Sequence, residues 1–250
     1  MTGQKPQGKR NNQMIGKKEA LVIIPTYNEV NNVRNTLEAV KSANIEVTVL
    51  FIDDNSADGT GAVLDDMAKR DSAVQVMHRP RRMGLGTAYT AGFAYALKQG
   101  FKFIVEMDAD GQHDPRYLKD LIRLCDQYDL VIGSRYKGGI RFLNITLFRI
   151  LLATLANRYI RFITGMGISD ATSGLRVFRR EVLEALPLEK IYSRGFAFQI
   201  EMAYRAWKKG FKIHEYPIIF YSRRDDISKM SLGICLEAFL VALRLRLFVR

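Results

Sequence analysis

Asp108-Ala-Asp-Gly-Gln-His113 follows directly on the apolar run Phe101–Met107. The run has the length and the aromatic and β-branched content of a sheet strand. Side chains two apart on an extended chain point the same way, and open α/β sheets bind ligands at the carboxyl ends of their strands. The stretch therefore predicts a buried strand that ends at a binding site. A turn whose carboxylates are solvated or cap the next helix is the alternative interpretation.

The carboxylates of this stretch also suit a metal. Asp108 and Asp110 can share one hard divalent cation, with Gln112 as a further oxygen donor. Like charges this close repel unless a cation lies between them. A metal held by few protein oxygens keeps positions for phosphate oxygens, so the pattern predicts a metal site that takes a phosphate-bearing substrate. His113 is a candidate ligand or a neighbour of one.

Apolar runs and helical patterns alternate along the rest of the chain. Polar loops at Pro25–Glu29 and Asp53–Asp58 each follow a predicted strand, as Asp108 does. The alternation predicts an α/β fold with a mostly parallel sheet covered by helices on both faces. The predicted strands are Ala20–Pro25, Val47–Ile52, Val74–Met77, Phe101–Met107, Leu130–Gly133, Gly174–Arg179 and Phe211–Tyr221. The predicted helices are Val30–Val40, Thr60–Arg70, Gly84–Gln99, Pro115–Gln127, Leu143–Thr164, Phe196–Lys209 and Ser231–Phe248.

Composition and charge narrow the class of partner. The 250 residues are 48% hydrophobic and 26% charged, which is ordinary for a soluble protein. We predict one α/β domain at 20–230, preceded by a disordered basic tail at 1–19 and followed by an amphipathic helix at 231–250. The net charge of +12 arises entirely after residue 134, where 21 basic side chains face 9 acidic ones. Such a surplus suits nucleic acid, an anionic membrane or a phosphate-bearing substrate. A merely solvated basic surface is the alternative.

Cysteines and apolar segments indicate the compartment. Cys125 and Cys235 lack metal-ligand spacing and predict two buried thiols in a reducing environment. The first 20 residues lack the apolar core of a signal peptide, so we expect no secretion. Arginines interrupt Leu143–Thr164 and the final helix, which predicts helices that cover a core or lie in a membrane interface rather than span it.

Eight short motifs occur in the order found in one enzyme family. They resemble glycosyltransferase family 2 with its GT-A fold, and within it the dolichol-phosphate (polyprenyl-phosphate) mannose synthases, over about residues 20–230. The motifs are Val22-Ile-Ile-Pro-Thr-Tyr-Asn-Glu29, Ile52-Asp-Asp-Asn-Ser56, Gly84-Leu-Gly-Thr-Ala-Tyr89, Met107-Asp-Ala-Asp-Gly-Gln-His113, Gly133-Ser-Arg-Tyr136, Asp170-Ala-Thr-Ser-Gly174, Phe198-Gln-Ile-Glu-Met202 and Ser228-Lys-Met230.

The resemblance implies an activity: inverting, metal-dependent transfer of mannose from GDP-mannose to a polyprenyl monophosphate, with Mg²⁺ or Mn²⁺ as cofactor. It also implies residue roles. The implied nucleotide-sugar-binding residues are Pro25, Tyr27, Glu29, Asp53, Asp54, Asp108 and Ala109. The implied metal ligands are Asp108, Asp110 and Gln112. The implied acceptor-phosphate residues are Ser134, Arg135, Arg149, Arg223 and Lys229. The implied catalytic residues are Asp110, Arg135 and Arg223.

Two positions depart from the family pattern. Asp226 stands where a glycine usually precedes the Ser-Lys pair by two residues, so we expect the loop around Arg223 to differ in shape or charge. Ala153 stands where some relatives have an acceptor-side serine. Neither change affects the predicted metal site.

The chemistry of a lipid phosphate agrees with the basic second half. Its second pKa of about 6 leaves it anionic at neutral pH, so it needs a cationic cradle rather than a strong base. We expect a peripheral enzyme on the cytoplasmic face of a membrane, with a separate membrane anchor subunit as a candidate partner. UDP-glucose is the alternative donor. Nucleic-acid binding is the alternative from another class, although aromatic side chains are not interleaved with the basic ones, and we expect no nucleic acid.

Overall fold

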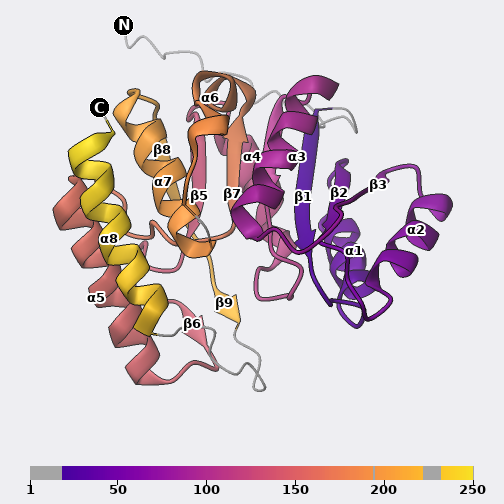
Figure 1. Ribbon diagram of the computed structural model, residues 1–250, viewed down its shortest axis with the longest axis horizontal. Coiled ribbons are helices and arrows are strands. Elements are labelled where there is room, and N and C mark those ends of the chain that lie inside the picture. The colour runs from indigo at the N-terminus through magenta and orange to yellow at the C-terminus, as the bar shows by residue number, and fades with distance from the viewer. Residues whose placement is uncertain (1–18, 194, 222–231, 250) are drawn as a thin grey trace, which may run out of the picture.

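The computed structural model describes residues 19–193, 195–221 and 232–249 (Figure 1). Within these ranges one sheet has seven strands in the order β3-β2-β1-β4-β7-β5-β8, and β6 pairs with β9 in a second, two-stranded sheet. The strands are β1 (Ala20–Thr26), β2 (Thr48–Asp53), β3 (Val74–His78), β4 (Phe103–Glu106), β5 (Leu130–Ser134), β6 (Phe142–Leu143), β7 (Arg176–Arg179), β8 (Ile213–Pro217) and β9 (Phe220–Tyr221).

The main sheet is parallel except for one strand. β7 runs antiparallel to both of its neighbours, β4 and β5, while the other pairs are parallel. The predicted α/β class and mostly parallel sheet are therefore confirmed. The reversal has a consequence for the site, because the segment that leads into β7 begins at the edge where β4 and β5 end.

Helices cover both faces of the sheet. They are α1 (Val33–Ser42), α2 (Thr60–Arg70), α3 (Leu85–Gln99), α4 (Leu118–Leu124), α5 (Leu147–Thr164), α6 (Arg180–Ala185), α7 (Gly195–Lys208) and α8 (Leu232–Phe248), with 3₁₀ turns η1 (Pro115–Tyr117) and η2 (Leu188–Lys190). Side chains along β1 alternate between the two faces of the sheet. Leu21 and Ile23 pack in one core with α3 and α7, and Val22 and Ile24 pack in the other core with α1, α2 and α4. Two apolar layers result.

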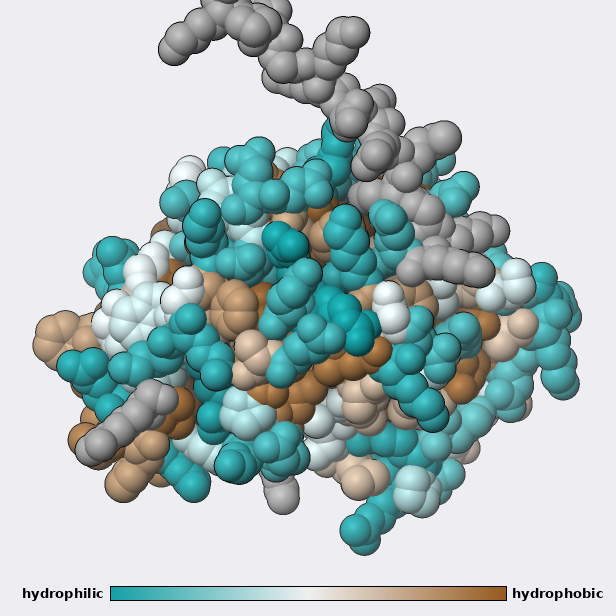
Figure 2. Space-filling view, turned by 90° about the horizontal axis from the view of Figure 1, so that it is seen from above, coloured by the Kyte–Doolittle hydropathy of each residue, from teal (hydrophilic) through white to brown (hydrophobic). Residues whose placement is uncertain are grey.

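Helices α5 and α8 lie side by side at one end of the sheet (Figure 1). Val241, Ala242 and Leu245 of α8 are buried in the core beside α3 and α7. Both helices also keep large apolar side chains at the surface: Leu147, Phe148, Leu151, Leu155, Phe162, Phe239, Leu240, Leu247 and Phe248. Among the described residues, none of the helices combines the length and the apolar content that crossing a bilayer requires. Seen from above, the molecule is mostly hydrophilic with smaller hydrophobic patches (Figure 2).

The element boundaries differ from prediction at several places. Leu143, predicted to begin a helix, lies in β6, and α5 begins at Leu147. The helix predicted from Pro115 starts as η1, where the Asp114 side chain accepts the Arg116 N–H, and α4 ends three residues before Gln127. The strand predicted at Phe211–Tyr221 divides into β8 and β9, which join different sheets. Helix α6 was not predicted, since six residues are too short for a periodic apolar pattern.

Candidate active site

The loop after β4 carries the predicted metal ligands. The Asp110 carboxylate accepts a hydrogen bond from the Gln112 backbone N–H at 3.0 Å, and Gly111 between them has a φ of 73°, which glycine adopts without strain. The Asp108 side chain, two residues before this turn, is 29% exposed. Asp110 and Gln112 therefore belong to one tight turn that follows the buried strand and Asp108, and their role as metal ligands stays a prediction.

Asp108 is held by two neighbours on its inner side. The Tyr89 hydroxyl of α3 donates to Oδ1 at 3.1 Å, and the buried His113 ring places Nδ1 3.7 Å from Oδ2. Burial, reinforced by the Asp108 carboxylate, raises the pKa of Tyr89 well above its usual range, so the phenol stays a donor. Burial lowers the pKa of His113, although Asp108 opposes this, so the ring is neutral at pH 7.

A second carboxyl group lies beneath the loop. Glu106, the last residue of β4, is fully buried, and burial raises its pKa to about 8 against the opposing charge of Arg176. Arg176 of β7 is buried as well and donates to the main-chain carbonyls of Ala171, Ser173 and Gln199 at 2.6 to 2.8 Å. Glu106 is thus mostly protonated at neutral pH, which limits the repulsion within this acidic cluster.

The loop after β2 uses its two carboxylates differently. Asp53 accepts hydrogen bonds from the Ser56 backbone and hydroxyl, at 3.1 and 2.6 Å, and shapes its own turn. Asp54 is buried in an ion pair with Arg79 and accepts the backbone N–H groups of Met83 and Gly84 at 2.9 and 3.1 Å. Asp54 therefore anchors the start of α3, a role that sequence reasoning did not foresee.

The loop after β1 carries an exposed aromatic ring. The Tyr27 ring is 39% exposed, and the guanidinium of Arg82 lies over it at 4.5 Å. The Glu29 backbone N–H donates to the Thr60 hydroxyl at 2.9 Å, which ties this loop to α2. Pro25, within β1, is half-buried. An exposed ring beside a cation offers a stacking surface to a planar group.

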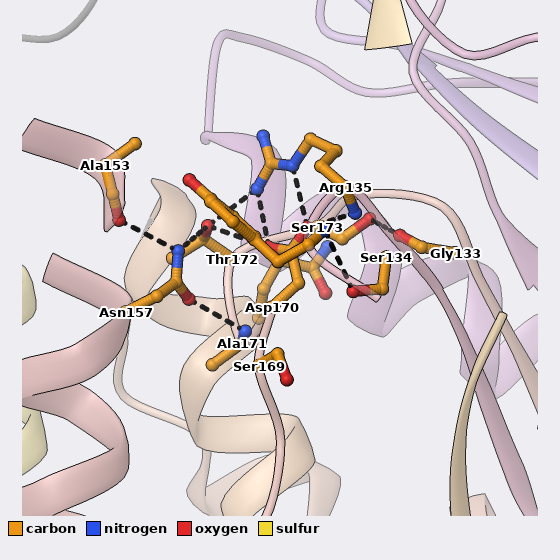
Figure 3. Close-up of polar contacts among 12 residues, drawn as sticks. Gly133, Ser134, Arg135, Ala153, Asn157, Ser169, Asp170, Ala171, Thr172 and Ser173 are labelled. Carbon is orange, nitrogen blue, oxygen red and sulfur yellow. Dashed lines mark hydrogen bonds and ion pairs between the residues drawn. The ribbon is translucent and has the colours of Figure 1, made fainter. Parts of the chain in front are cut away.

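Arg135, directly after β5, forms the centre of the acceptor-side cluster (Figure 3). Its guanidinium donates two hydrogen bonds to the Asp170 carboxylate, at 2.8 and 2.6 Å, and one to Thr172, while its backbone N–H also donates to Asp170 at 2.9 Å. Burial tends to raise the pKa of Asp170, but the Arg135 charge outweighs it and lowers that pKa. The pair is therefore ionised and rigid.

The loop that carries Asp170 is fastened on both sides. The Glu215 carboxylate of β8 accepts the backbone N–H groups of Ser169 and Asp170, both at 2.9 Å. The Asn157 side chain of α5 accepts the Ala171 N–H at 3.0 Å and donates to the Ala153 carbonyl at 3.1 Å (Figure 3). The position of the departure at Ala153 thus lies beside this network and contributes its main chain to it.

Aromatic rings surround the same guanidinium. The rings of Tyr136, Phe142 and Phe220 have centroids 5.3 to 6.0 Å from the Arg135 guanidinium carbon. Phe142 and Phe220 face each other because β6 pairs with β9. Ser134 is fully buried, and its hydroxyl accepts backbone N–H groups of the following turn. Cation and rings together make a cluster whose chemistry suits an anion joined to an apolar chain.

The two clusters meet. A Cβ on Gly174 would lie 2.7 Å from Asp108 Oδ2, so only glycine lets the β7 loop pass the metal-ligand carboxylate. The Tyr221 N–H of β9 donates to the Gln112 carbonyl at 3.3 Å, and the His113 ring packs against Phe220. Side chains that are predicted for donor and acceptor are therefore neighbours in space.

Other predicted residues lie elsewhere or outside the described ranges. Arg149 is half-buried on α5, and Ala109 is buried with its carbonyl accepting the Thr36 hydroxyl. Arg223, Lys229 and the departure at Asp226 fall within 222–231, which the structure does not describe. The side chain of Cys235, on α8, is likewise not described. Cys125 is buried, as predicted. Glu201, expected in the pocket or on a helix surface, is instead buried and bonded to Arg205 and the Ser193 N–H.

The donor set fits a hard divalent cation. In the part of the chain that the structure describes, no three His, Cys, Asp or Glu side chains are grouped to hold a metal. Two carboxylates and an amide oxygen would leave most coordination positions of a divalent cation open. Such a site suits a metal that is completed by substrate phosphate oxygens.

Comparisons with known proteins agree with this arrangement. The model of the family described as glycosyl transferase family 2 matches residues 21–186. A polyprenol monophosphomannose synthase of Mycolicibacterium smegmatis is 47% identical over 213 residues, covering 84% of this chain and 80% of the relative. An undecaprenyl-phosphate mannosyltransferase of Micrococcus luteus is 42% identical over 218 residues, covering 87% of this chain and 90% of the relative.

Solved structures share the fold at lower identity. Glucosyl-3-phosphoglycerate synthase from Mycobacterium tuberculosis, in complex with Mn²⁺, UDP-glucose and phosphoglyceric acid, superposes with a TM-score of 0.65 at 18% identity. The match covers 91% of this chain and 79% of that one. The predicted GT-A fold is confirmed.

Proposed function

The chain belongs to glycosyltransferase family 2 and is a glycosyltransferase, and from that premise we propose that it transfers mannose from GDP-mannose to a polyprenyl monophosphate. The product is polyprenyl-phosphate mannose. The two relatives, a polyprenol monophosphomannose synthase and an undecaprenyl-phosphate mannosyltransferase, support mannose transfer to a polyprenyl phosphate. One observation in the molecule carries the proposal: the oxygen-ligand loop at Asp108 and the arginine-centred cluster at Arg135 converge on one edge of the sheet, where Gly174 contacts Asp108.

The donor side neutralises charge on the leaving group. Asp108, Asp110 and Gln112 would hold Mg²⁺ or Mn²⁺, which supplies Lewis-acid stabilisation of the departing diphosphate. The exposed Tyr27 ring and the Asp53 turn would receive the nucleoside. Asp54 serves this side indirectly, because it orders the loop before α3.

The acceptor side positions an anion. A phosphate monoester oxygen is already charged at neutral pH, so it can attack the anomeric carbon without a strong general base. Its bond to carbon forms as the carbon–oxygen bond to the diphosphate breaks on the opposite face, which inverts the configuration. Arg135, fixed by Asp170, would help to hold the phosphate, with Arg149, Arg223 and Lys229 as the further predicted cations and the Ser134 turn beside them.

The lipid chain points to a membrane. The exposed apolar side chains of α5 and α8 lie beside arginines on the same helices, a pattern of segments that rest in an interface. We infer a peripheral enzyme on the cytoplasmic face, alone or with a membrane anchor subunit. Flotation with anionic liposomes at low salt measures this, and recovery only in the soluble fraction would contradict it.

The first test of function is sugar transfer to a short polyprenyl phosphate. GDP-mannose and UDP-glucose are compared with Mg²⁺ or Mn²⁺ and again with EDTA. We expect metal-dependent product from GDP-mannose, and loss of turnover with retained circular dichroism in Asp110→Ala. A preference for UDP-glucose would change the donor and keep the mechanism, whereas near-normal turnover of Asp110→Ala would remove the metal site from the proposal.

A further inference from the structure

The motif Gly84–Tyr89 has no assigned task in the transfer reaction. A glycine-rich helix start offers backbone N–H groups to a phosphate, and here the two N–H groups directly before the helix are engaged within the protein. Met83 and Gly84 donate to Asp54, and the Gly84 carbonyl accepts from Arg79 at 3.2 Å. The motif is therefore attached to protein groups at its beginning, and its function lies at its other end.

The second glycine of the motif lets two helices approach closely. A Cβ on Gly86 would lie 2.9 Å from Phe198 Cδ2 and 3.1 Å from the Ser193 carbonyl oxygen, so α3 packs on α7 only with glycine there. Phe198 in turn stacks on Tyr89, with ring centroids 6.0 Å apart and planes 12° apart. The glycine thus sets the place of the tyrosine ring.

The Tyr89 ring is fully enclosed. Phe93, one turn further along α3, stacks on it at 6.3 Å, and Phe198 encloses it on the α7 side. A tyrosine has two side-chain torsions, and both are fixed when the ring is packed in this way. The hydroxyl position is consequently a property of the core rather than of the loop that it contacts.

That hydroxyl meets Asp108. It donates to Oδ1 at 3.1 Å, while Oδ2 lies toward Gly174 and the His113 ring. We propose that Tyr89 is a positioning residue whose buried hydroxyl holds the Asp108 carboxylate in the orientation that binds the metal of the sugar-nucleotide complex. This inference rests on the proposed metal-dependent function.

The expected magnitude follows from partners of this kind in other metal sites. Removing a group that orients a metal ligand typically weakens metal binding 10- to 100-fold, although the ligand itself remains. Asp108 keeps its charge and its place directly after β4 when the hydroxyl is removed, so we expect an effect at the low end, about 10-fold.

The chain offers a matched control on the same helix. Tyr95 of α3 donates its hydroxyl to the Gln75 side chain at 2.5 Å, in a contact between α3 and β3 that involves none of the metal-loop residues. Tyr89→Phe and Tyr95→Phe each remove one hydroxyl and one hydrogen bond from the same helix. Only the first removes a contact to a predicted metal ligand.

The experiment measures Mn²⁺ affinity directly, by electron paramagnetic resonance of free Mn²⁺ during titration in the presence of GDP. We expect about 10-fold weaker Mn²⁺ binding by Tyr89→Phe and less than a twofold change in Tyr95→Phe. GDP binding in EDTA should be the same in both variants. Gly174→Ala, which places a Cβ against Oδ2 with the tyrosine intact, should also weaken Mn²⁺ binding.

Four outcomes would overturn the inference. Unchanged Mn²⁺ affinity in Tyr89→Phe, or equal weakening in Tyr95→Phe, would show that the hydroxyl does not act through Asp108. Weakening in Gly174→Ala without weakening in Tyr89→Phe would assign the positioning to the β7 loop instead. Failure of the unaltered protein to bind Mn²⁺ with either GDP or UDP would instead remove the proposed metal-dependent function, and the inference with it.

Discussion

Two buried ion pairs flank the candidate site, and they are built in opposite ways. Arg79 and Asp54 on the donor side are 7% and 8% exposed, and both bind the segment that begins α3. On the acceptor side Asp170 is fully buried, whereas Arg135 is 13% exposed and faces aromatic rings. Both side chains of the donor-side pair are buried, whereas the arginine of the acceptor-side pair is partly exposed.

The difference teaches which arginine is available to a substrate. Arg79 donates hydrogen bonds to Asp54, Thr87 and the Gly84 carbonyl, so it stabilises the fold. Arg135 is oriented by a carboxylate whose loop is itself held through main-chain N–H groups, and its guanidinium is partly exposed beside aromatic rings. A buried ion pair can therefore either stabilise the fold or orient a cation for contact with a substrate.

The largest expected effect comes from Asp170→Ala. It leaves the Arg135 charge without its buried partner and releases the loop, so we expect a loss of about 3–5 kcal/mol in the free energy of unfolding, measured in urea. The control is Glu181→Ala, because Glu181 pairs with Arg179 at the surface and should lose about 0–1 kcal/mol. Equal losses in the two variants would break the comparison.

Asp54→Asn addresses the donor-side pair. The change keeps the shape but removes the charge that Arg79 meets, and we expect about 1–3 kcal/mol lower stability. Since Asp54 stabilises the segment that begins α3 and does not contact the nucleotide in this interpretation, the KM for the sugar nucleotide should change less than threefold. A tenfold increase in that KM with unchanged stability would show instead that Asp54 contacts the nucleotide, as the family resemblance implies.

Arg135→Lys tests whether Arg135 contacts the lipid phosphate or only stabilises the fold. Lysine keeps the charge but cannot make the paired contacts to a carboxylate and a phosphate, so we expect about a tenfold increase in the KM for the lipid phosphate, roughly 1.4 kcal/mol. GDP affinity should not change. The matched variant Arg79→Lys should lower stability and leave the lipid KM as it is, and the reverse pattern would exchange the two roles.

The smallest effect is a pH dependence. The pKa of Asp170 is lowered in the folded protein, so its stabilising contribution is present above its unfolded pKa, near 4, and is lost as pH falls through the folded value. The difference in unfolding free energy between the unaltered protein and Asp170→Asn should shrink below about pH 4. A difference that grows on acidification would show that the sign of the shift is wrong.

The sequence predicted the layers and the edge where the site lies, because strand periodicity and strand-end carboxylates are local signals. It did not predict that β7 enters between β4 and β5, since pairing partners far apart in the chain leave no periodic trace. The same limit hid the partner of Arg135: Asp170 stood in a quoted motif, yet its distance of 35 residues concealed the contact.

The structure also shows contacts that the motifs did not indicate. The Gly84 N–H donates to Asp54, and Gly86 packs against Phe198. Tyr89 was visible in the same motif, and a buried tyrosine needs a partner for its hydroxyl, which was the available signal. The roles of Arg223 and Lys229 stay predictions.

The insertion of β7 between β4 and β5 also sets an order for assembly during synthesis. Strands β1 to β4 pair with one another from residues 20–106, so this part can form its sheet early. Strand β5 pairs only with β7 and β8 among the described strands, and both are made later. The nascent chain must therefore hold an apolar strand unpaired until about residue 179 has left the ribosome, which makes that interval the one most exposed to aggregation.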